Sequence, residues 1–182
     1  MDLKGKKVLV FGAGKSGIGA ADLLGSVGAQ PIIYDGNENL DKEAVLHKTN
    51  GTYTPEIWAG AFPEGEMESL DLVVLSPGVP TDLPLVKSFY EKGLPVWSEV
   101  ELAYRTGKGE VLAITGTNGK TTTTALLGKI MGDARESVFV VGNIGTAYTS
   151  KSLEMREDSV TVAEISSFQL ETVHEFHPLV SA

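Results

Sequence analysis

The sequence predicts an α/β fold in which two parallel β-sheets follow one another along the chain. Short runs rich in Val, Ile and Leu alternate with amphipathic stretches, and Gly and Pro separate them. Unalternated apolar runs of this length are typical of parallel strands that are covered on both faces. Two glycine-rich loops each follow such a run and precede a helical stretch, which is the strand–loop–helix order of α/β units.

The strands are predicted from their apolar runs and the glycine or proline residues that bound them. The expected strands are Lys7–Phe11, Pro31–Tyr34, Leu72–Leu75, Pro95–Trp97, Val111–Thr115, Val138–Val141, Val160–Ile165 and Pro178–Val180.

Two helices are predicted from the spacing of their apolar residues. In the first, Ile18, Ala21 and Leu24 recur every three residues, and Gly28 is the expected C-terminal stop. The second follows Lys120, and its expected apolar face consists of Ala125, Leu126, Ile130 and Met131.

A polar stretch from Trp97 to Gly109 separates the two series of strands. We therefore predict domains over residues 1–97 and 98–182. The chain stops on the apolar run Leu179–Ala182. A loop is expected after a strand at this place in an α/β sheet, so the second domain is either small and complete or the front part of something longer.

Composition and charge exclude several classes of protein. Twenty-four acidic and 15 basic residues give a net charge of −9, which argues against a protein that binds nucleic acid through clustered Lys and Arg. No apolar run reaches the roughly 18 residues of a membrane span, and the N-terminus lacks the apolar core of a signal peptide. The chain has no cysteine, which excludes disulfides and thiolate chemistry. We expect a cytoplasmic protein.

The first glycine-rich loop predicts a site for the diphosphate of a nucleotide. Gly12, Gly14 and Gly17 form the pattern G-x-G-x-x-G, with Lys15 and Ser16 between the last two glycines. Such a loop lets a diphosphate approach the N-terminal amides of the following helix. An NAD-type dinucleotide and a UDP-sugar both satisfy this pattern, and a glycine turn needed only for strand–helix packing is a third interpretation.

Asp35 stands 21 residues after Gly14, at the end of the second strand. A ribose-binding acid is expected near this position. A turn residue at a strand end is the alternative interpretation.

The second glycine-rich loop predicts a triphosphate site. It runs through Gly116, Thr117, Asn118, Gly119, Lys120, Thr121 and Thr122. Its G-K-T core allows the backbone to wrap phosphates, while Lys120 supplies positive charge and Thr121 offers a hydroxyl to Mg²⁺. Ile114 occupies the position of the first glycine in the strict P-loop pattern, so the match is to the core of the motif.

Glu164 is an acid at the end of an apolar strand. A carboxylate in such a strand is costly unless it is paired or faces a cation. Opposite the hydroxyl of Thr121, Glu164 would serve as a Mg²⁺ ligand. A salt-bridged strand residue is the alternative.

Four segments together resemble the Mur ligases of peptidoglycan synthesis. They are TGTNGKTT at residues 115–122, GNIG at 142–145, EISSFQL at 164–170 and SPGVP at 76–80. Phe168 and Gln169 after the serine pair resemble the branch that adds D-glutamate.

The resemblance implies a Rossmann-like first domain that binds the UDP of a substrate, followed by a P-loop ATPase-type domain truncated at its C-terminus. Its implied ligands are ATP, Mg²⁺, D-glutamate and UDP-N-acetylmuramoyl-L-alanine, which it joins in an ATP-dependent ligase reaction through an acyl phosphate. A further domain, a metal-ligand segment with a histidine and a carbamylated lysine would lie beyond this chain, so we expect the chain alone to be inactive. His174 and His177 do not match the histidine motif and receive no metal role.

The implied site residues fall into three groups. Catalysis would involve Lys120, Glu164 and Asn143, and ATP binding the loop of residues 116–122. The metal would be held by Thr121 and Glu164. The UDP-substrate would be bound by Gly12, Gly14, Lys15, Ser16, Gly17, Asp35, Ser76, Pro77, Gly78, Asn143, Ser166 and Gln169.

Two rival hypotheses remain. An NAD(P)-binding Rossmann module explains the first loop but leaves Lys120, Thr121 and Glu164 without a role. A folded nucleotide-binding fragment without catalysis is the other.

Overall fold

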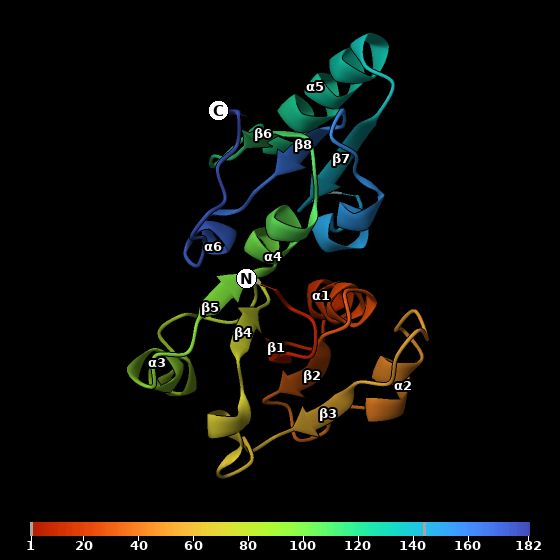
Figure 1. Ribbon diagram of the computed structural model, residues 1–182. Coiled ribbons are helices and arrows are strands. Elements are labelled where there is room, and N and C mark those ends of the chain that lie inside the picture. Colours follow the sequence, from red (N-terminus) through yellow and green to blue (C-terminus); the bar gives the residue numbers. More distant parts are fainter. Residues whose placement is uncertain (1, 144) are drawn as a thin grey trace. The chain divides into compact units, whose positions relative to one another are not determined.

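The chain folds into two compact units, residues 1–99 and residues 100–182 (Figure 1). The structure is a computed structural model, and it describes residues 2–143 and 145–182. Each unit is an α/β structure with its own parallel sheet. The predicted α/β fold class is confirmed.

The first unit contains a five-stranded parallel sheet in the order β3-β2-β1-β4-β5. This is the strand order of a doubly wound, Rossmann-like sheet. Its strands are β1 (Lys7–Phe11), β2 (Gln30–Asp35), β3 (Glu56–Ala59), β4 (Leu72–Leu75) and β5 (Val96–Ser98). Its helices are α1 (Lys15–Ser26), α2 (Lys42–Leu46) and α3 (Pro84–Glu91), with the 3₁₀ turn η1 (Glu66–Ser69).

Helices cover both faces of this sheet because successive strand side chains point in opposite directions. On one face, α3 buries Val86 and Phe89 in a cluster with Leu9 and Val73. Helix α1 contacts β1, β2 and β4 and buries the predicted stripe that includes Ile18. The chain leaves α1 through Gly28, whose φ of +80° favours glycine.

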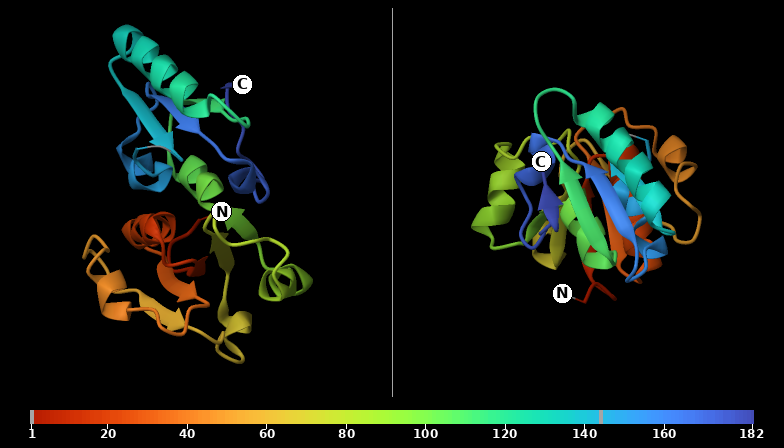
Figure 2. Two further views of the ribbon diagram at one scale, coloured as in Figure 1. Left: turned by 180° about the vertical axis from the view of Figure 1, so that it is seen from behind. Right: turned by 90° about the horizontal axis from the view of Figure 1, so that it is seen from above.

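The second unit contains a four-stranded parallel sheet in the order β7-β8-β6-β9. Its strands are β6 (Glu110–Ile114), β7 (Val138–Gly142), β8 (Val160–Glu164) and β9 (Val180–Ser181). Its helices are α4 (Glu99–Thr106), α5 (Lys120–Ala134) and α6 (Ser167–Leu170), with the 3₁₀ turns η2 (Tyr148–Ser150) and η3 (Ser152–Glu154). Seen from above in Figure 2, α5 runs alongside the sheet, where it contacts β6, β7 and β8.

The core of the second unit places β8 at its centre. All five residues of β8 are buried, because β6 and β7 flank it on both sides. Val100 and Ala103 of α4 pack against one face of the sheet together with Ala113 and Ala163. Helix α5 packs against the other face.

Several features of the fold differ from the sequence-based prediction, and helices α2, α3 and α6 were not among the predicted elements. Strand β3 was not predicted, because its four residues carry only a short apolar signal between polar neighbours. The helix predicted after Lys120 is present as α5, but the residues that it buries against the sheet are Thr124 and Gly128, whereas Leu126 and Ile130 of its apolar face are 57% and 53% exposed. The helix lies so close to the sheet that a Cβ on Gly128 would meet Val140 Cγ2 at 2.4 Å, so only small residues fit on that face.

The other predicted elements agree with the structure to within one or two residues at most of their ends. Thr115 and Ile165 lie one residue beyond β6 and β8, and β5 begins at Val96 rather than Pro95. Within the described residues, no helix is both long enough and apolar enough to cross a bilayer.

Candidate nucleotide-binding and phosphoryl-transfer site

The first glycine-rich loop connects β1 to the N-terminus of α1. Gly12 adopts a φ of +110° and donates its N–H to the carbonyl of Tyr34 at 2.7 Å. Gly14 is the N-cap of α1 and provides no side-chain cap. The N-terminal amides of α1 therefore have no competing side-chain acceptor from the cap residue, as an anion site at a helix N-terminus requires.

Close packing explains the glycines of this loop. A Cβ on Gly17 would lie 1.8 Å from the carbonyl oxygen of Gly12, and a Cβ on Gly12 would lie 2.8 Å from Ser76 Oγ. Ser76, Pro77 and Gly78 follow β4, which pairs with β1. The predicted UDP-substrate residues of the first unit thus gather where β1 and β4 end, together with Lys15 and Ser16 at the start of α1.

The side chain of Asp35 accepts a hydrogen bond from the first glycine-rich loop. Its Oδ2 accepts the N–H of Ala13 at 3.0 Å, and its Oδ1 accepts the N–H of Asn37 at 3.0 Å. The carboxylate of Asp35 therefore stabilises the conformation of the loop at Ala13. A ligand-binding role for Asp35 remains a prediction.

The second glycine-rich loop connects β6 to α5. Gly116 and Gly119 have φ values of +128° and +80°, and Gly119 is the N-cap of α5 without a side-chain cap. Residues 115–119 are exposed. Lys120 Nζ donates to the carbonyl of Gly116 at 2.7 Å, so the lysine side chain folds back over the loop where phosphates would lie.

Glu164, Thr121 and Asn143 form one hydrogen-bonded group beside this loop. Glu164 Oε2 accepts from Thr121 Oγ1 at 2.9 Å, and Glu164 Oε1 accepts from Asn143 Nδ2 at 3.1 Å. The backbone N–H of Asn143 also donates to the carbonyl of Glu164 at 2.9 Å. Three segments far apart in sequence meet here because β6, β7 and β8 are parallel neighbours whose carboxyl ends share one edge.

Gly142 allows this close approach. It pairs with Glu164 across the sheet, and a Cβ at Gly142 would lie 2.1 Å from the Glu164 carbonyl oxygen. Ile144, the third residue of the segment 142–145, lies outside the described residues.

The donor set at Glu164 fits a magnesium ion. The carboxylate is 1% exposed, and the side chains that donate hydrogen bonds to it, Thr121 and Asn143, are neutral. Mg²⁺ prefers oxygen ligands and is usually held by one or two carboxylates together with waters and substrate phosphates. Within residues 2–143 and 145–182, no group of three or more His, Asp or Glu side chains is arranged to hold a metal.

Ser166 and Gln169 form a capping box at α6. The N–H of Ser166 donates to Gln169 Oε1 at 2.7 Å, and the N–H of Gln169 donates to Ser166 Oγ at 3.4 Å. Gln169 is buried, whereas the neighbouring Phe168 is 64% exposed. The capping box fixes the first turn after β8, directly beyond Glu164.

Both units match descriptions of known domain families. Residues 6–98 match "Mur ligase MurD-like, N-terminal domain" and residues 114–181 match "Mur ligase middle domain".

Curated relatives match along the whole chain. It is 61% identical over 182 residues to a UDP-N-acetylmuramoylalanine--D-glutamate ligase of Lachnospira eligens, 100% of this chain and 40% of the relative. The protein of the same name from Lachnoclostridium phytofermentans is 55% identical, again with 100% and 40% coverage. The chain therefore spans about 40% of the length of these relatives.

Solved structures share the fold at low identity. A UDP-N-acetylmuramate:L-alanyl-gamma-D-glutamyl-meso-diaminopimelate ligase from Neisseria meningitides matches 97% of this chain and 59% of its own, with a TM-score of 0.56 and 17% identity. A murein peptide ligase from Psychrobacter arcticus matches 89% of this chain and 37% of its own, with a TM-score of 0.53 and 20% identity. With both units matched by family descriptions, the chain belongs to the Mur ligase family.

Proposed function

We propose that a protein built on these two units is an ATP-dependent ligase that joins D-glutamate to UDP-N-acetylmuramoyl-L-alanine. The name of the curated relatives supports this reaction. Because the chain spans about 40% of their length, the proposal concerns the protein that carries these units together with the remaining parts of a ligase.

One observation carries the proposal: the hydroxyl of Thr121 and the carboxylate of Glu164 are hydrogen-bonded at 2.9 Å beside a loop that contains Lys120. A hydroxyl from a phosphate-binding loop facing a strand-end carboxylate is the arrangement that phosphoryl transfer needs. Binding of NAD(P) does not require this arrangement of Thr121, Glu164 and Lys120.

In the first step, a substrate carboxylate attacks the γ-phosphorus of ATP, and ADP leaves with the bonding electrons. Two anions must approach each other, so neutralisation of charge dominates the barrier. Lys120 and the loop amides of residues 116–121 bind the phosphate oxygens. Thr121 and Glu164 would hold Mg²⁺, which supplies further positive charge to the phosphates when it is bound.

In the second step, the amine of D-glutamate attacks the acyl phosphate carbonyl. The amine loses a proton, phosphate leaves, and an amide bond remains. Asn143, Ser166 and Gln169 surround the end of β8 and would position the muramoyl-alanine arm that carries the reacting carboxylate. In the first unit, the N-terminal amides of α1 would bind the UDP diphosphate.

Calorimetric titration of the 182-residue chain tests the assignment of nucleotides. We expect UDP-N-acetylmuramoyl-L-alanine to bind and NADH not to bind. We also expect ATP to bind more tightly with Mg²⁺ than without it. Tight binding of NADH with no binding of the UDP compound would favour the redox module and contradict the proposal.

A further inference from the structure

Side chains of helix α4 bind the chain segment that follows α6, residues 174–177. Glu101, Tyr104 and Arg105 lie three and four residues apart and therefore share one face of the helix. All three contact residues 174–177, which lie between α6 and β9. We call these three side chains the α4 clasp.

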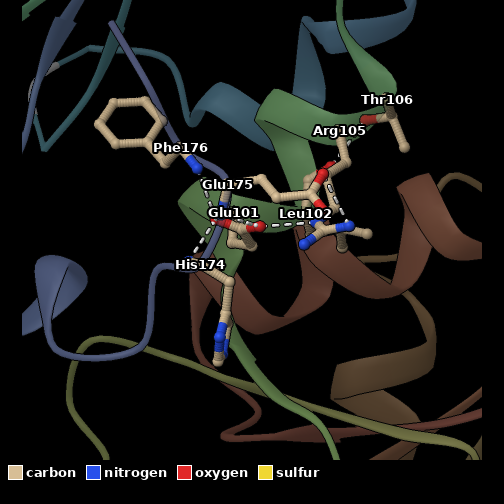
Figure 3. Close-up of polar contacts among 7 residues, drawn as sticks. All are labelled: Glu101, Leu102, Arg105, Thr106, His174, Glu175 and Phe176. Carbon is tan, nitrogen blue, oxygen red and sulfur yellow. Dashed lines mark hydrogen bonds and ion pairs between the residues drawn. The ribbon is translucent and has the colours of Figure 1, made fainter. Parts of the chain in front are cut away.

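Glu101 is the centre of the α4 clasp (Figure 3). Its Oε2 accepts the N–H groups of His174 at 2.9 Å and Phe176 at 3.0 Å, and its Oε1 accepts that of Glu175 at 2.9 Å. Arg105 Nε also donates to Oε1. Glu101 is fully buried, at 0% exposure, so one carboxylate inside the unit binds three consecutive backbone amides.

The contacts keep Glu101 ionised despite its burial. Burial raises the pKa of Glu101, but the amide hydrogen bonds of His174, Glu175 and Phe176 together with Arg105 outweigh it and lower the pKa overall. Charge-assisted hydrogen bonds of this kind are about twice as strong as neutral ones.

Tyr104 and Arg105 add contacts on either side of Glu101. Tyr104 donates its hydroxyl to the carbonyl of His177 at 3.2 Å, and its ring packs edge-on against Phe176 with centroids 5.4 Å apart. Arg105 Nη1 lies 3.0 Å from Glu175 Oε2. Backbone and side chains of residues 174–177 are thus both held.

Residues 174–177, which the α4 clasp holds, begin a few residues after Gln169, the last residue of the candidate site. The chain passes from Glu164 through the capping box of Ser166 and Gln169 to residues 174–176, and no strand lies between them. A short connection that is anchored at its far end has little freedom at its near end. The anchor at 174–176 therefore limits the conformations available to Ser166 and Gln169.

We propose that Glu101 is a positioning residue: its carboxylate fixes residues 174–176 and, through them, holds the turn of Ser166 and Gln169 in the conformation that binds the muramoyl-alanine arm of the substrate. This role rests on the proposed function, because it requires that arm to bind beside α6. Glu101 itself would touch no substrate.

Hydrogen exchange of the ligand-free chain tests the clasp without reference to function. Glu101→Gln keeps the shape of the side chain but turns an NH₂ group toward N–H donors. We expect the amides of residues 174–176 to exchange at least tenfold faster than in the wild type. A rate increase of this size corresponds to the free energy of about one charged hydrogen bond. Glu110→Gln, the same substitution at an exposed position of β6, should leave these amides unchanged. Unchanged exchange in Glu101→Gln would overturn the clasp.

Binding measurements then test positioning. We expect Glu101→Gln to weaken UDP-N-acetylmuramoyl-L-alanine on the order of tenfold, with the affinities for UDP and for ATP with Mg²⁺ unchanged. A general disturbance of the second unit would lower the ATP affinity as well, so this split separates a local loss of positioning from a loss of the folded unit. Equal affinity of variant and wild type for the full substrate would overturn positioning.

Tyr104→Phe gives a second, milder test in case Glu101→Gln does not fold. It removes one hydroxyl and retains the ring, so we expect a smaller loss in the same direction for the full substrate, and an unchanged affinity would count against positioning. Failure of a longer protein that carries both units to bind UDP-N-acetylmuramoyl-L-alanine and ATP would refute the proposed function instead, while the exchange result would still decide the clasp.

Discussion

The position of the Lys120 side chain depends on a contact with its own loop. Its ammonium group contacts the carbonyl of Gly116 at 2.7 Å, a neutral partner that a phosphate oxygen would readily replace because a charged acceptor bonds more strongly.

We predict that Lys120→Ala lowers turnover of the complete ligase on the order of 10²–10³-fold, as expected for loss of one group that stabilises the transition state. In the 182-residue chain it should weaken binding of ATP with Mg²⁺, as measured by calorimetry. Lys129→Ala, an exposed lysine on the same helix, is the matched control and should behave like the wild type. Undiminished turnover in Lys120→Ala would remove this lysine from the mechanism.

Glu164 is a buried carboxylate that accepts hydrogen bonds from two neutral side chains, those of Thr121 and Asn143. Burying a charge in this way is costly, so its retention favours a role in binding a cation.

We predict that Glu164→Gln unfolds at the same or a higher temperature than the wild type in the absence of Mg²⁺, because a neutral amide is cheaper to bury. The same variant should lose the gain in ATP affinity that Mg²⁺ produces. Thermal unfolding and titrations with and without Mg²⁺ measure both effects. A variant that retains the Mg²⁺ effect would show that Glu164 does not hold the metal.

At the scale of the element, α5 contains a natural pair of test sites. Gly128 faces the sheet, where a Cβ would meet Val140 Cγ2 at 2.4 Å, whereas a Cβ on Gly132 would meet nothing within 4 Å. Both glycines lie inside the helix.

We predict opposite effects of alanine at these two positions. Gly128→Ala should destabilise the second unit by about 1–3 kcal/mol, because the close contact forces α5 away from the sheet. Gly132→Ala should stabilise it by up to about 1 kcal/mol through helix propensity. Urea unfolding of the two variants measures the difference, and a stabilising Gly128→Ala would contradict the close packing of α5.

The α4 clasp links stability to pH. The native pKa of Glu101 lies below its ordinary value of 4.5. Its contribution to stability is therefore complete above about pH 4.5 and is lost as the pH falls through the native pKa.

We predict that Glu101→Gln lowers the unfolding free energy by about 3 kcal/mol at neutral pH, in the range for breaking a buried charged pair. This difference from the wild type should shrink toward zero as the pH falls, because the protonated glutamic acid resembles glutamine. Unfolding curves at a series of pH values measure it. A difference that stays constant down to pH 2 would mean that the charge of Glu101 does not matter.

At the scale of the whole molecule, the chain carries two units with separate cores. Each has a glycine-rich loop at the carboxyl end of a strand, and each loop precedes a helix without a side-chain cap. The net charge of −9 creates an overall field that repels anions, so the proposed function requires anionic nucleotides to be bound by local backbone amides and Lys120.

We predict that the 182-residue chain binds UDP-N-acetylmuramoyl-L-alanine and ATP but releases no phosphate. It spans about 40% of the length of the curated relatives, and the family resemblance implies further metal-binding residues outside it. A phosphate-release assay with both substrates, D-glutamate and Mg²⁺ measures this. Steady release of phosphate would refute the prediction, and a longer protein with both units is the positive control.

Most of the fold and much of the candidate site were predictable from the sequence. Strands of buried Val and Leu, such as β1 and β4, can be recognised from their local sequence, and so can the position of a glycine-rich loop between a strand and a helix. The packing of α5 could not be predicted from the sequence, because apolar spacing cannot show that Leu126 and Ile130 are exposed while Gly128 lies against the sheet.

Local patterns along the chain were sufficient for the class of fold and for both glycine-rich loops, because each strand, loop and helix depends on residues close to one another in the sequence. The contacts that join distant segments required the folded chain. Thr121 meets Glu164 across 43 positions, and Glu101 meets residues 174–176 across 73 to 75. Such contacts arise from strand order and helix packing, which bring together groups that no local pattern relates.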